Sequence, residues 1–426
     1  MRVLFAVFPA TAHLHPIVPL AWALQNAGHE VRVAIHPDAV DLVTGAGLAA
    51  VPLGSRDKLA AVVEFNSNPD RTDSLDDALF LDTADTSGWE AQWERMCKVL
   101  SMYRQVLPDL VDFTRSWQPD LVVWDQFCVP AAVAARVSGA AQARMLWGRD
   151  NIGWLRARSR EHLAARGARP QEDPVHALME GMLTPYGLEY EEELLLGQWT
   201  IDPMPPGMQL PVELPFVSVR RVPYNGAAAL PDWVHERPER PRVCLTLGVG
   251  GRGRQLFRQT GVSFAEVVQA VAELDVEMVA TVGATQRNSI AAVPDNVRLV
   301  EYMPLNHLLP TCSAVIHHGG GGTFAAAAAH RVPQLITPML FWGETTIAQY
   351  VADRGAGLVI DSDRFTTDAL RKGLTRLLED RSFQDGAAAL HREMEETPSP
   401  ADLVPVLEEL TARHRRQAAR GDVIAG

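Results

Sequence analysis

Two polar side chains in the first half of the sequence could carry out acid–base chemistry. His13 follows the apolar run Arg2–Phe8, and Asp125 follows the apolar run Leu121–Trp124. A histidine that is oriented by a carboxylate is a good general base near neutral pH. The spacing alone does not show that the two side chains meet. A surface histidine and an aspartate that caps a helix explain the same pattern equally well.

The second half contains a glycine-rich segment that is typical of a phosphate-binding loop. An apolar run ends at His317 and leads into His318, the glycines Gly319–Gly322, Thr323 and a helical run of alanines. Glycines let a ligand approach the backbone, and a helix N-terminus offers free N–H groups and a positive dipole. The segment favours a diphosphate, with His318 as a further donor to a leaving phosphate. The alternative is a tight turn with packing glycines and a core histidine.

Two weaker patterns also concern nucleotides. Gly248–Gly253 matches the dinucleotide fingerprint, but the residues that follow are a poor helix start. We therefore favour a loop that lines a cleft over a nicotinamide site. Asp361–Asp363 has the form of a D-x-D metal motif, yet a helix start follows it, so a turn and capping role is the better interpretation. We predict no metal site.

Composition excludes several classes of function. The 426 residues carry a formal net charge of −13, which argues against general binding to nucleic acid. No apolar run reaches the roughly 18 residues of a membrane span. The four cysteines are too far apart for a zinc site or a small disulfide framework, so we expect reduced core residues and a cytoplasmic protein: Cys97, Cys128, Cys244 and Cys312.

Parallel sheets are needed to position these residues. Apolar runs alternate with helical stretches in both halves of the chain, which predicts an α/β fold of two Rossmann-like parallel-sheet domains that face each other across a cleft. Ligands bind such sheets at the carboxyl ends of the strands. We predict one helix from Trp89 to Trp117 and a polar loop over 56–88. The predicted domains are 1–202, a Pro-rich linker 203–240, 241–398, and a C-terminal helix and tail 399–426 that packs back on the first domain.

Longer segments carry a resemblance to a known family. They are His13–Leu14, Val18–Leu24, Ala27–Val31, Trp117–Asp125, Gly197–Pro203, Asn296–Arg298, Pro304–Leu305, Leu308–Pro310, His317–Thr323 and Val332–Gln334. With these segments the sequence resembles the GT-B glycosyltransferases of actinomycete antibiotic pathways, which attach deoxysugars to polyketide aglycones. It is most similar to the macrolide amino-sugar transferases, such as desosaminyl- and forosaminyltransferases.

The resemblance implies a role for each matching residue. His13 corresponds to the base that deprotonates the acceptor hydroxyl, and Asp125 to the acid that holds it. His318 corresponds to the diphosphate-binding histidine, and Tyr302 to the aromatic that stacks on the base. Leu305 stands where many relatives carry Gln. The implied nucleotide-sugar site comprises Gly248, Tyr302, Leu305, His318, Gly320, Gly321, Gly322, Thr323, Trp342, Gly343 and Glu344.

Two departures from the family pattern bear on the donor. Ala326 stands where plant-type relatives carry a Glu that binds both ribose hydroxyls, which is consistent with a thymidine donor that has no 2′-hydroxyl. Gly343-Glu344 replaces the usual Asp/Glu-Gln pair that binds sugar hydroxyls. A deoxysugar has fewer hydroxyls, and an amino sugar would favour a carboxylate. We therefore expect a TDP-deoxysugar, with an amino sugar left open, near Trp342 and Glu344.

The resemblance thus implies an inverting transfer of a deoxysugar to a hydroxyl of a polyketide-type aglycone, without metal or other cofactor. It also implies a P450-like auxiliary protein, as some close relatives require, docked near residues 55–115, and leaves a homodimer open. The alternatives are a sugar-nucleotide epimerase of the same architecture, a non-catalytic auxiliary or binding protein, and a nicotinamide enzyme that uses Gly248–Gly253.

Overall fold

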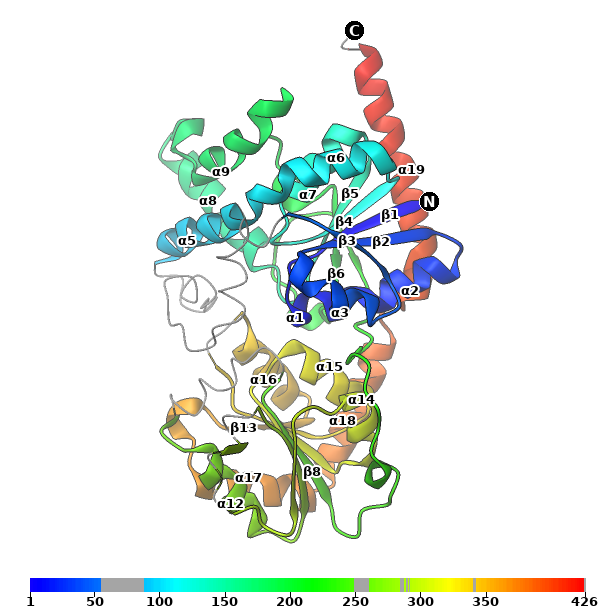
Figure 1. The fold of residues 1–426 in the computed structure, drawn as a ribbon. Helices are drawn as coiled ribbons and strands as arrows, with labels where there is room; N and C mark the ends of the chain where they lie inside the picture. Colours follow the sequence, from blue (N-terminus) through cyan, green and yellow to red (C-terminus); the bar gives the residue numbers. More distant parts are fainter. Residues whose placement is uncertain are drawn as a thin grey trace. The chain divides into compact units, whose positions relative to one another are not determined.

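The structure is a computed structural model that describes residues 1–54, 88–248, 260–283, 287–288, 290, 292–339 and 342–424. The chain divides into two compact units (Figure 1). The first unit comprises Met1–Arg220 and Pro398–Gly426, and the second comprises Arg221–Thr397. Among the described residues, no helix is both long enough and apolar enough to span a membrane.

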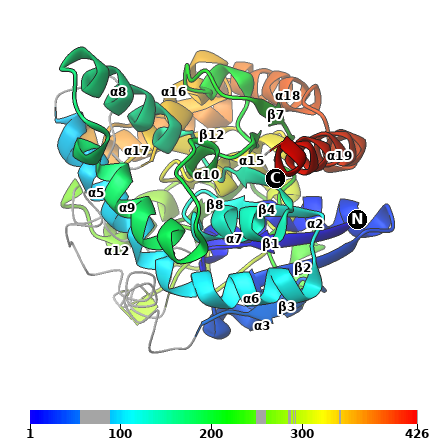
Figure 2. The same cartoon turned by 90° about the horizontal axis from the view of Figure 1, so that it is seen from above.

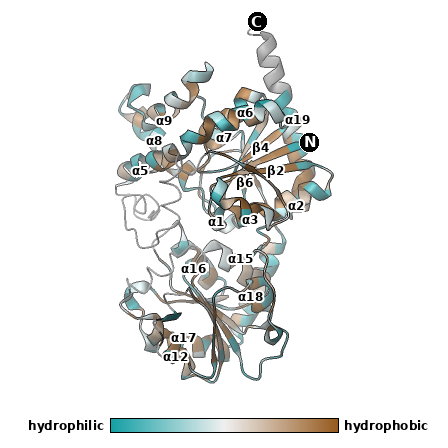
Figure 3. Cartoon of the chain, in the orientation of Figure 1, coloured by the Kyte–Doolittle hydropathy of each residue, from teal (hydrophilic) through white to brown (hydrophobic). Residues whose placement is uncertain are grey.

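A seven-stranded parallel sheet forms the centre of the first unit, in the order β3-β2-β1-β4-β5-β6-β7. Its strands are apolar along most of their length because helices cover both faces of a parallel sheet, and Figure 3 colours them as hydrophobic. The strands are β1 (Arg2–Ala6), β2 (Glu30–Ile35), β3 (Ala49–Pro52), β4 (Leu121–Asp125), β5 (Ala141–Met145), β6 (Trp199–Asp202) and β7 (Phe216–Ser218).

Helices connect and cover these strands. The C-terminal helix α19 packs against α2 and β5, and both Figure 1 and Figure 2 show it beside α2. The α-helices of this unit are α1 (Thr11–Leu14), α2 (Val18–Asn26), α3 (Val40–Thr44), α5 (Trp89–Ser101), α6 (Leu107–Trp117), α7 (Pro130–Ser138), α8 (Asn151–Ala165), α9 (Pro174–Leu183), α10 (Glu193–Leu196) and α19 (Pro400–Ile424). Short 3-10 turns lie at His15–Ile17, Pro37–Ala39, Met102–Val106, Pro170–Glu172, Thr184–Tyr186 and Pro206–Met208.

Two expectations about this unit differ from the structure. The single helix predicted over 89–117 is interrupted by the 3-10 turn Met102–Val106, after which Pro108 lies in the first turn of α6, where a proline is tolerated. The Pro-rich linker predicted from residue 203 contains β7, which pairs with β6, so the first unit continues to Arg220. A strand at a sheet edge tolerates neighbouring prolines because one of its sides has no partner. The loop predicted over 56–88 lies outside the described residues except for Gly88.

The second unit has a six-stranded parallel sheet in the order β10-β9-β8-β11-β12-β13. Its strands are β8 (Arg242–Thr246), β9 (Glu277–Thr281), β10 (Val297–Val300), β11 (Ala314–His317), β12 (Gln334–Ile336) and β13 (Gly357–Val359). Its α-helices are α12 (Phe264–Ala272), α14 (Leu305–Leu308), α15 (Gly321–Ala329), α16 (Glu344–Asp353), α17 (Thr367–Glu379) and α18 (Ser382–Glu395), with 3-10 turns at Asp232–Val234, Leu309–Thr311 and Ser362–Arg364. The predicted α/β class with two parallel sheets is confirmed.

Each sheet contains one point where the strand order reverses. In the first unit β1 lies beside β4, and in the second β8 lies beside β11. At such a point the connections leave in opposite directions, so a crevice opens outside the carboxyl ends of the two strands, where ligands bind. The residues that follow these four strands are therefore the first place to look for a site in each unit.

Candidate active site

The structure brings His13 and Asp125 together at the reversal point of the first sheet. His13 lies on α1, which follows β1, and Asp125 is the last residue of the neighbouring strand β4. The Nδ1 atom of His13 lies 2.7 Å from Oδ2 of Asp125, and both side chains are buried, with exposed fractions of 8% and 4%. The two chemistry-bearing residues of the first half thus form one pair, as the functional interpretation requires.

The pair is held in a defined orientation. The other carboxylate oxygen of Asp125, Oδ1, accepts a hydrogen bond of 2.9 Å from the backbone N–H of Phe127. Three aromatic rings surround the His13 imidazole at centroid distances of 4.9, 5.4 and 4.5 Å, those of Phe8, Phe127 and Trp147. With its Nδ1 proton donated to the carboxylate, the imidazole has Nε2 free to accept a proton. This geometry is chemically suited to a general base oriented by a carboxylate.

A buried polar cluster beside this pair was not predicted from the sequence. The guanidinium of Arg144 on β5 pairs with Asp150 and donates a 3.0 Å hydrogen bond to Thr200 on β6. Burial raises the pKa of Asp202, at the end of β6, to about 7, and Asp150 contributes to this increase. The one signal in the sequence is a charged or polar residue inside an otherwise apolar strand, as at Arg144 and Thr200.

The glycine-rich segment occupies the reversal point of the second sheet. It leaves β11 at His317, and α15 begins at Gly321 with Gly320 as an N-cap that offers no side-chain acceptor. Gly319 has a φ of +96°, and a Cβ there would lie 3.1 Å from Cβ of Glu344, so a side chain would be both strained and crowded. The glycine at this position is required by the loop geometry, and the helix N-terminus keeps its backbone donors uncapped by side chains.

The two histidines of the segment have different surroundings. The imidazole of His317 accepts a hydrogen bond from the backbone N–H of Gly319 at Nδ1, so its Nε2 donates to Oε1 of Gln334 at 3.0 Å. Burial lowers the pKa of His317 to about 3, and the ring is therefore neutral. His318, in contrast, lies against two glycines, since a Cβ at Gly320 or Gly248 would lie 3.0 Å or 3.3 Å from its ring.

The carboxylate of Glu344 lies close to the imidazole of His318. Its Oε1 is 3.5 Å from Nε2 of His318, and its Oε2 accepts a hydrogen bond of 3.2 Å from the backbone N–H of Met339. Gly343, with a φ of +104°, is the N-cap of α16, and Trp342 before it is buried. The carboxylate expected to contact the sugar is thus also placed to orient His318.

The remaining predicted residues lie on α15, on the neighbouring helix α14 and after β10. Thr323 is buried in the first turn of α15, and Leu305 begins α14, which packs against α15. Tyr302 is 39% exposed, and burial of its remaining surface together with nearby Tyr224 raises its pKa. A half-exposed aromatic ring is free to receive a stacking ligand.

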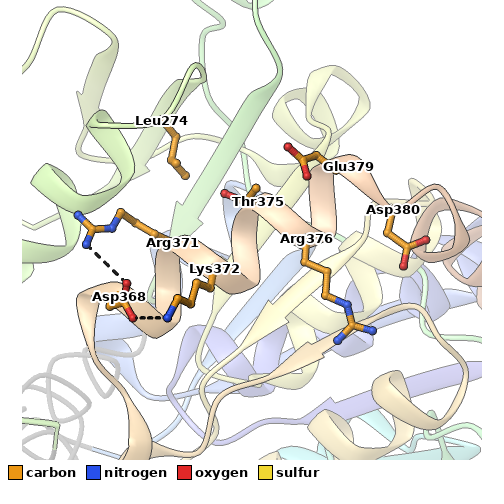
Figure 4. A pocket seen from close by; sticks show the side chains of 8 residues that line it. All are labelled: Leu274, Asp368, Arg371, Lys372, Thr375, Arg376, Glu379 and Asp380. Atoms are coloured by element: carbon orange, nitrogen blue, oxygen red, sulfur yellow. Dashed lines mark ion pairs between the residues drawn. The ribbon is translucent and has the colours of Figure 1, made fainter.

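Other patterns from the sequence do not add to the site. Of Gly248–Gly253 only Gly248 belongs to the described residues. Asp361 precedes the 3-10 turn Ser362–Arg364, which contains Asp363, and the hydroxyl of Thr366, not an aspartate, caps α17. A shallow hollow of about 620 Å³ along α17 is lined by Leu274, Asp368, Arg371 and Lys372 among others (Figure 4). None of the residues that line it is a predicted site residue.

Two family models match the chain and together cover most of it. Residues 22–248 match the N-terminal domain, and residues 265–410 the C-terminal domain, of the erythromycin biosynthesis protein CIII-like family. The chain belongs to this family of glycosyltransferases. It is 46% identical to an aclacinomycin-T 2-deoxy-L-fucose transferase of Streptomyces galilaeus, over 99% of both chains. It is 44% identical to a 10-deoxymethynolide desosaminyltransferase of Streptomyces venezuelae, over 98% of this chain and 99% of the relative.

Solved structures of related glycosyltransferases agree with this assignment. The glycosyltransferase VinC, solved in complex with dTDP, matches with a TM-score of 0.86 and 38% identity, over 97% of this chain and all of that chain. The spinosyn forosaminyltransferase SpnP matches with a TM-score of 0.79 and 43% identity, over 97% and 99% of the two chains. The fold is GT-B. This chain is a glycosyltransferase and not a sugar-nucleotide epimerase.

Proposed function

We propose that this glycosyltransferase transfers a deoxysugar from a TDP-sugar to a hydroxyl group of a polyketide-type aglycone, with inversion at the anomeric carbon. The His13–Asp125 pair carries the proposal, because a buried imidazole held at 2.7 Å by a carboxylate is the group that a hydroxyl acceptor needs. The relatives named above transfer 2-deoxyfucose and desosamine, and VinC was solved with dTDP, which supports the choice of sugar and nucleotide.

The proton transfer follows from the hydrogen bonds of the pair. Nε2 of His13 takes the proton of the acceptor hydroxyl as its oxygen attacks the anomeric carbon. The imidazolium that forms is stabilised by Asp125, whose second oxygen is fixed by the backbone of Phe127. The aromatic rings of Phe8, Phe127 and Trp147 keep water from the imidazole, which strengthens its ion pair with the carboxylate.

The leaving group is assigned to the glycine-rich segment of the second unit. As the new bond forms, the bond between the anomeric carbon and the phosphate oxygen breaks, and its electron pair leaves with TDP. The growing charge on the diphosphate is stabilised by the uncapped N-terminus of α15 and by His318 beside Gly320. Because these groups supply the positive potential, the proposed reaction includes no metal ion and no cofactor other than the TDP-sugar.

The surroundings of Ala326 and Glu344 bear on the donor. Ala326 is buried within α15 and has no side-chain oxygen to accept a hydrogen bond from a ribose hydroxyl, which agrees with a thymidine nucleotide. We place the deoxysugar near Trp342 and Glu344. A carboxylate at this place, 3.5 Å from His318, would also attract an ammonium group of an amino sugar.

The experiment that tests this function compares ligands and products. Calorimetric titrations with TDP, UDP and NAD should give the tightest binding for TDP and none for NAD. Incubation with a TDP-deoxysugar and a panel of polyketide aglycones should give a glycoside in the mass spectrum. Conversion of the donor without an aglycone would contradict the proposal. So would the absence of reaction with any pair, under conditions where TDP binds, even after co-expression with an auxiliary protein.

The proposal also includes an auxiliary protein, and it leaves open whether the chain forms a homodimer. We propose a P450-like auxiliary protein that docks near residues 55–115, of which 88–115 lie among the described residues on α5, the 3-10 turn after it and α6. Activity lost on purification and restored by co-expression with such a protein would support it, and full activity of the isolated chain would contradict it. Sedimentation of the same sample decides between a monomer and a homodimer.

A further inference from the structure

The first residue of the second unit, Arg221, places a cation at the N-terminus of α15. A Cβ atom at Gly321 would lie 3.1 Å from Nη1 of Arg221, and one at Gly322 would lie 3.9 Å from Nη2. The guanidinium therefore lies directly against the backbone of the first two residues of the helix. The sequence pattern did not single out this residue, since it lies about 100 positions before the glycines in a Pro-rich stretch.

The position is electrostatically unusual for an arginine. Arginine side chains favour the C-terminus of a helix, because the N-terminus carries a partial positive charge. Burial lowers the pKa of Arg221 to about 10, which still leaves the guanidinium charged at neutral pH. An anion bound at this place would be attracted both by the guanidinium and by the helix N-terminus.

The chain after Arg221 is fixed to the same unit by hydrogen bonds. Nδ2 of Asn306 donates to the backbone oxygen of Pro223 at 2.8 Å, and the backbone N–H of Asn306 donates to Oδ1 of Asn225 at 2.8 Å. Asn306 lies on α14, which packs against α15. These hydrogen bonds fix the segment after Arg221 close to α15. Less conformational entropy is therefore lost when the Arg221 side chain binds a ligand.

We propose that Arg221 is a diphosphate ligand of this enzyme, whose guanidinium N–H groups bind phosphate oxygens of the donor together with the backbone N–H groups of Gly321 and Gly322. The planar fork of a guanidinium matches two phosphate oxygens. The proposal rests on the proposed function, since it specifies how the second unit holds the leaving diphosphate. In the reaction Arg221 stabilises the charge that TDP gains as the bond to the sugar breaks.

Ligands with and without phosphates separate this role from a structural one. Arg221→Gln should weaken TDP binding by about tenfold to a hundredfold, the loss of a charge-assisted hydrogen bond, as measured by calorimetry. Thymidine, which has no phosphate, should bind both proteins alike when detected by saturation-transfer NMR. Arg221→Lys should fall between the two, because it keeps the charge and loses the fork. Arg220→Gln, one residue earlier in the first unit, is the matched control and should bind TDP normally.

A second variant tests the contact itself. Gly321→Ala would place a methyl group 3.1 Å from Nη1 and displace the guanidinium, so it should weaken TDP binding. Combined with Arg221→Gln it should add less than its separate effect, because both changes remove one interaction. Unchanged TDP binding in Arg221→Gln, an equal loss of thymidine binding, or additive effects of the two changes would each overturn the proposal. Failure of the unmodified protein to bind TDP would instead count against the proposed function.

Discussion

At the scale of single residues, His13 is the group on which the acceptor chemistry depends. Asp125 and three aromatic rings hold its imidazole, and its Nε2 is the nitrogen left to accept a proton. The apolar runs that precede the two residues placed both at one edge of a parallel sheet, but they did not show that the side chains meet. That contact depends on β1 lying beside β4. The polar cluster of Arg144 and Asp202 was not predictable in this way, since its charges lie within or at the end of strands that are otherwise apolar.

Replacing His13 with Ala should lower kcat by about 10²- to 10⁴-fold, the usual contribution of a general base. TDP affinity should not change, because the diphosphate is assigned to residues of the second unit. Turnover by coupled TDP release and TDP binding by calorimetry measure the two effects. His15→Ala is the control, since His15 lies two residues further along in a 3-10 turn. A His13→Ala protein with normal turnover would remove His13 from the mechanism.

His317 predicts how stability depends on pH. The pKa of His317 in the folded protein is about 3, below the ordinary value of about 6.5. Between these two pH values the imidazole is protonated in the unfolded chain and neutral in the folded chain, so the free energy of unfolding falls as the pH falls. The contribution of His317 to the free energy of unfolding is present in full above about pH 6.5 and is lost progressively as the pH falls towards 3. His317→Gln keeps an amide for hydrogen bonding and removes the titration, so its melting temperature should fall less between pH 7.5 and 5. Parallel pH profiles for the two proteins would contradict this origin.

At the scale of elements, the start of α15 and the preceding loop form the proposed donor site. The run of four glycines indicated this loop from the sequence alone, because more glycines occur there than a turn requires. What the sequence did not reveal is that Glu344, at the start of α16, lies against Gly319 and His318. Contacts between elements that are about 25 residues apart depend on packing, which local pattern does not encode.

Gly319→Ala should damage both the loop and the site. The new methyl group would be forced into a left-handed conformation and would lie 3.1 Å from Cβ of Glu344, so we expect a loss of about 1–3 kcal/mol in stability and weaker TDP binding. Gly355→Ala is the control, since Gly355 also has a positive φ of +62° but has no atom within 4 Å of the added Cβ. Chemical denaturation and TDP titration of both variants provide the measurements. Equal effects of the two changes would show that backbone strain alone, not the contact with Glu344, explains the loss.

Edge and helix boundaries were the least predictable elements. β7 has only three residues among prolines, so nothing in its composition separated it from a linker, and only its pairing with β6 defines it. The helix predicted over 89–117 is divided by the 3-10 turn Met102–Val106, and Pro108 lies in the first turn of α6, where a proline removes no helical hydrogen bond. Such features come from tertiary pairing and from single residues rather than from periodicity.

At the scale of the whole molecule, the C-terminal helix belongs with the N-terminal sheet. Leu403, Val404 and Leu407 of α19 are buried, and His414 stacks on Trp199 of β6 at a centroid distance of 5.2 Å. Arg415 forms an ion pair with Asp120, which precedes β4. The first and last parts of the chain therefore lie in the same unit. We predicted this packing for residues 399–426 from the sequence.

Ending the chain after Thr397 should destabilise the first unit. Each buried leucine or valine contributes about 1.5–3 kcal/mol, so the melting temperature should fall by more than about 5 °C. Hydrogen exchange should increase in α2 and β5, against which α19 packs, and not in the second sheet. An unchanged melting temperature, or increased exchange confined to the second unit, would be inconsistent with this packing.

The most direct test of the central claim is a balanced product analysis of the purified protein, with its auxiliary partner if one is required. One equivalent of TDP should appear for each glycoside formed, and NMR of the glycoside should show an anomeric configuration opposite to that of the donor. Retention of configuration, or TDP released without glycoside in the presence of a competent aglycone, would contradict direct displacement assisted by His13.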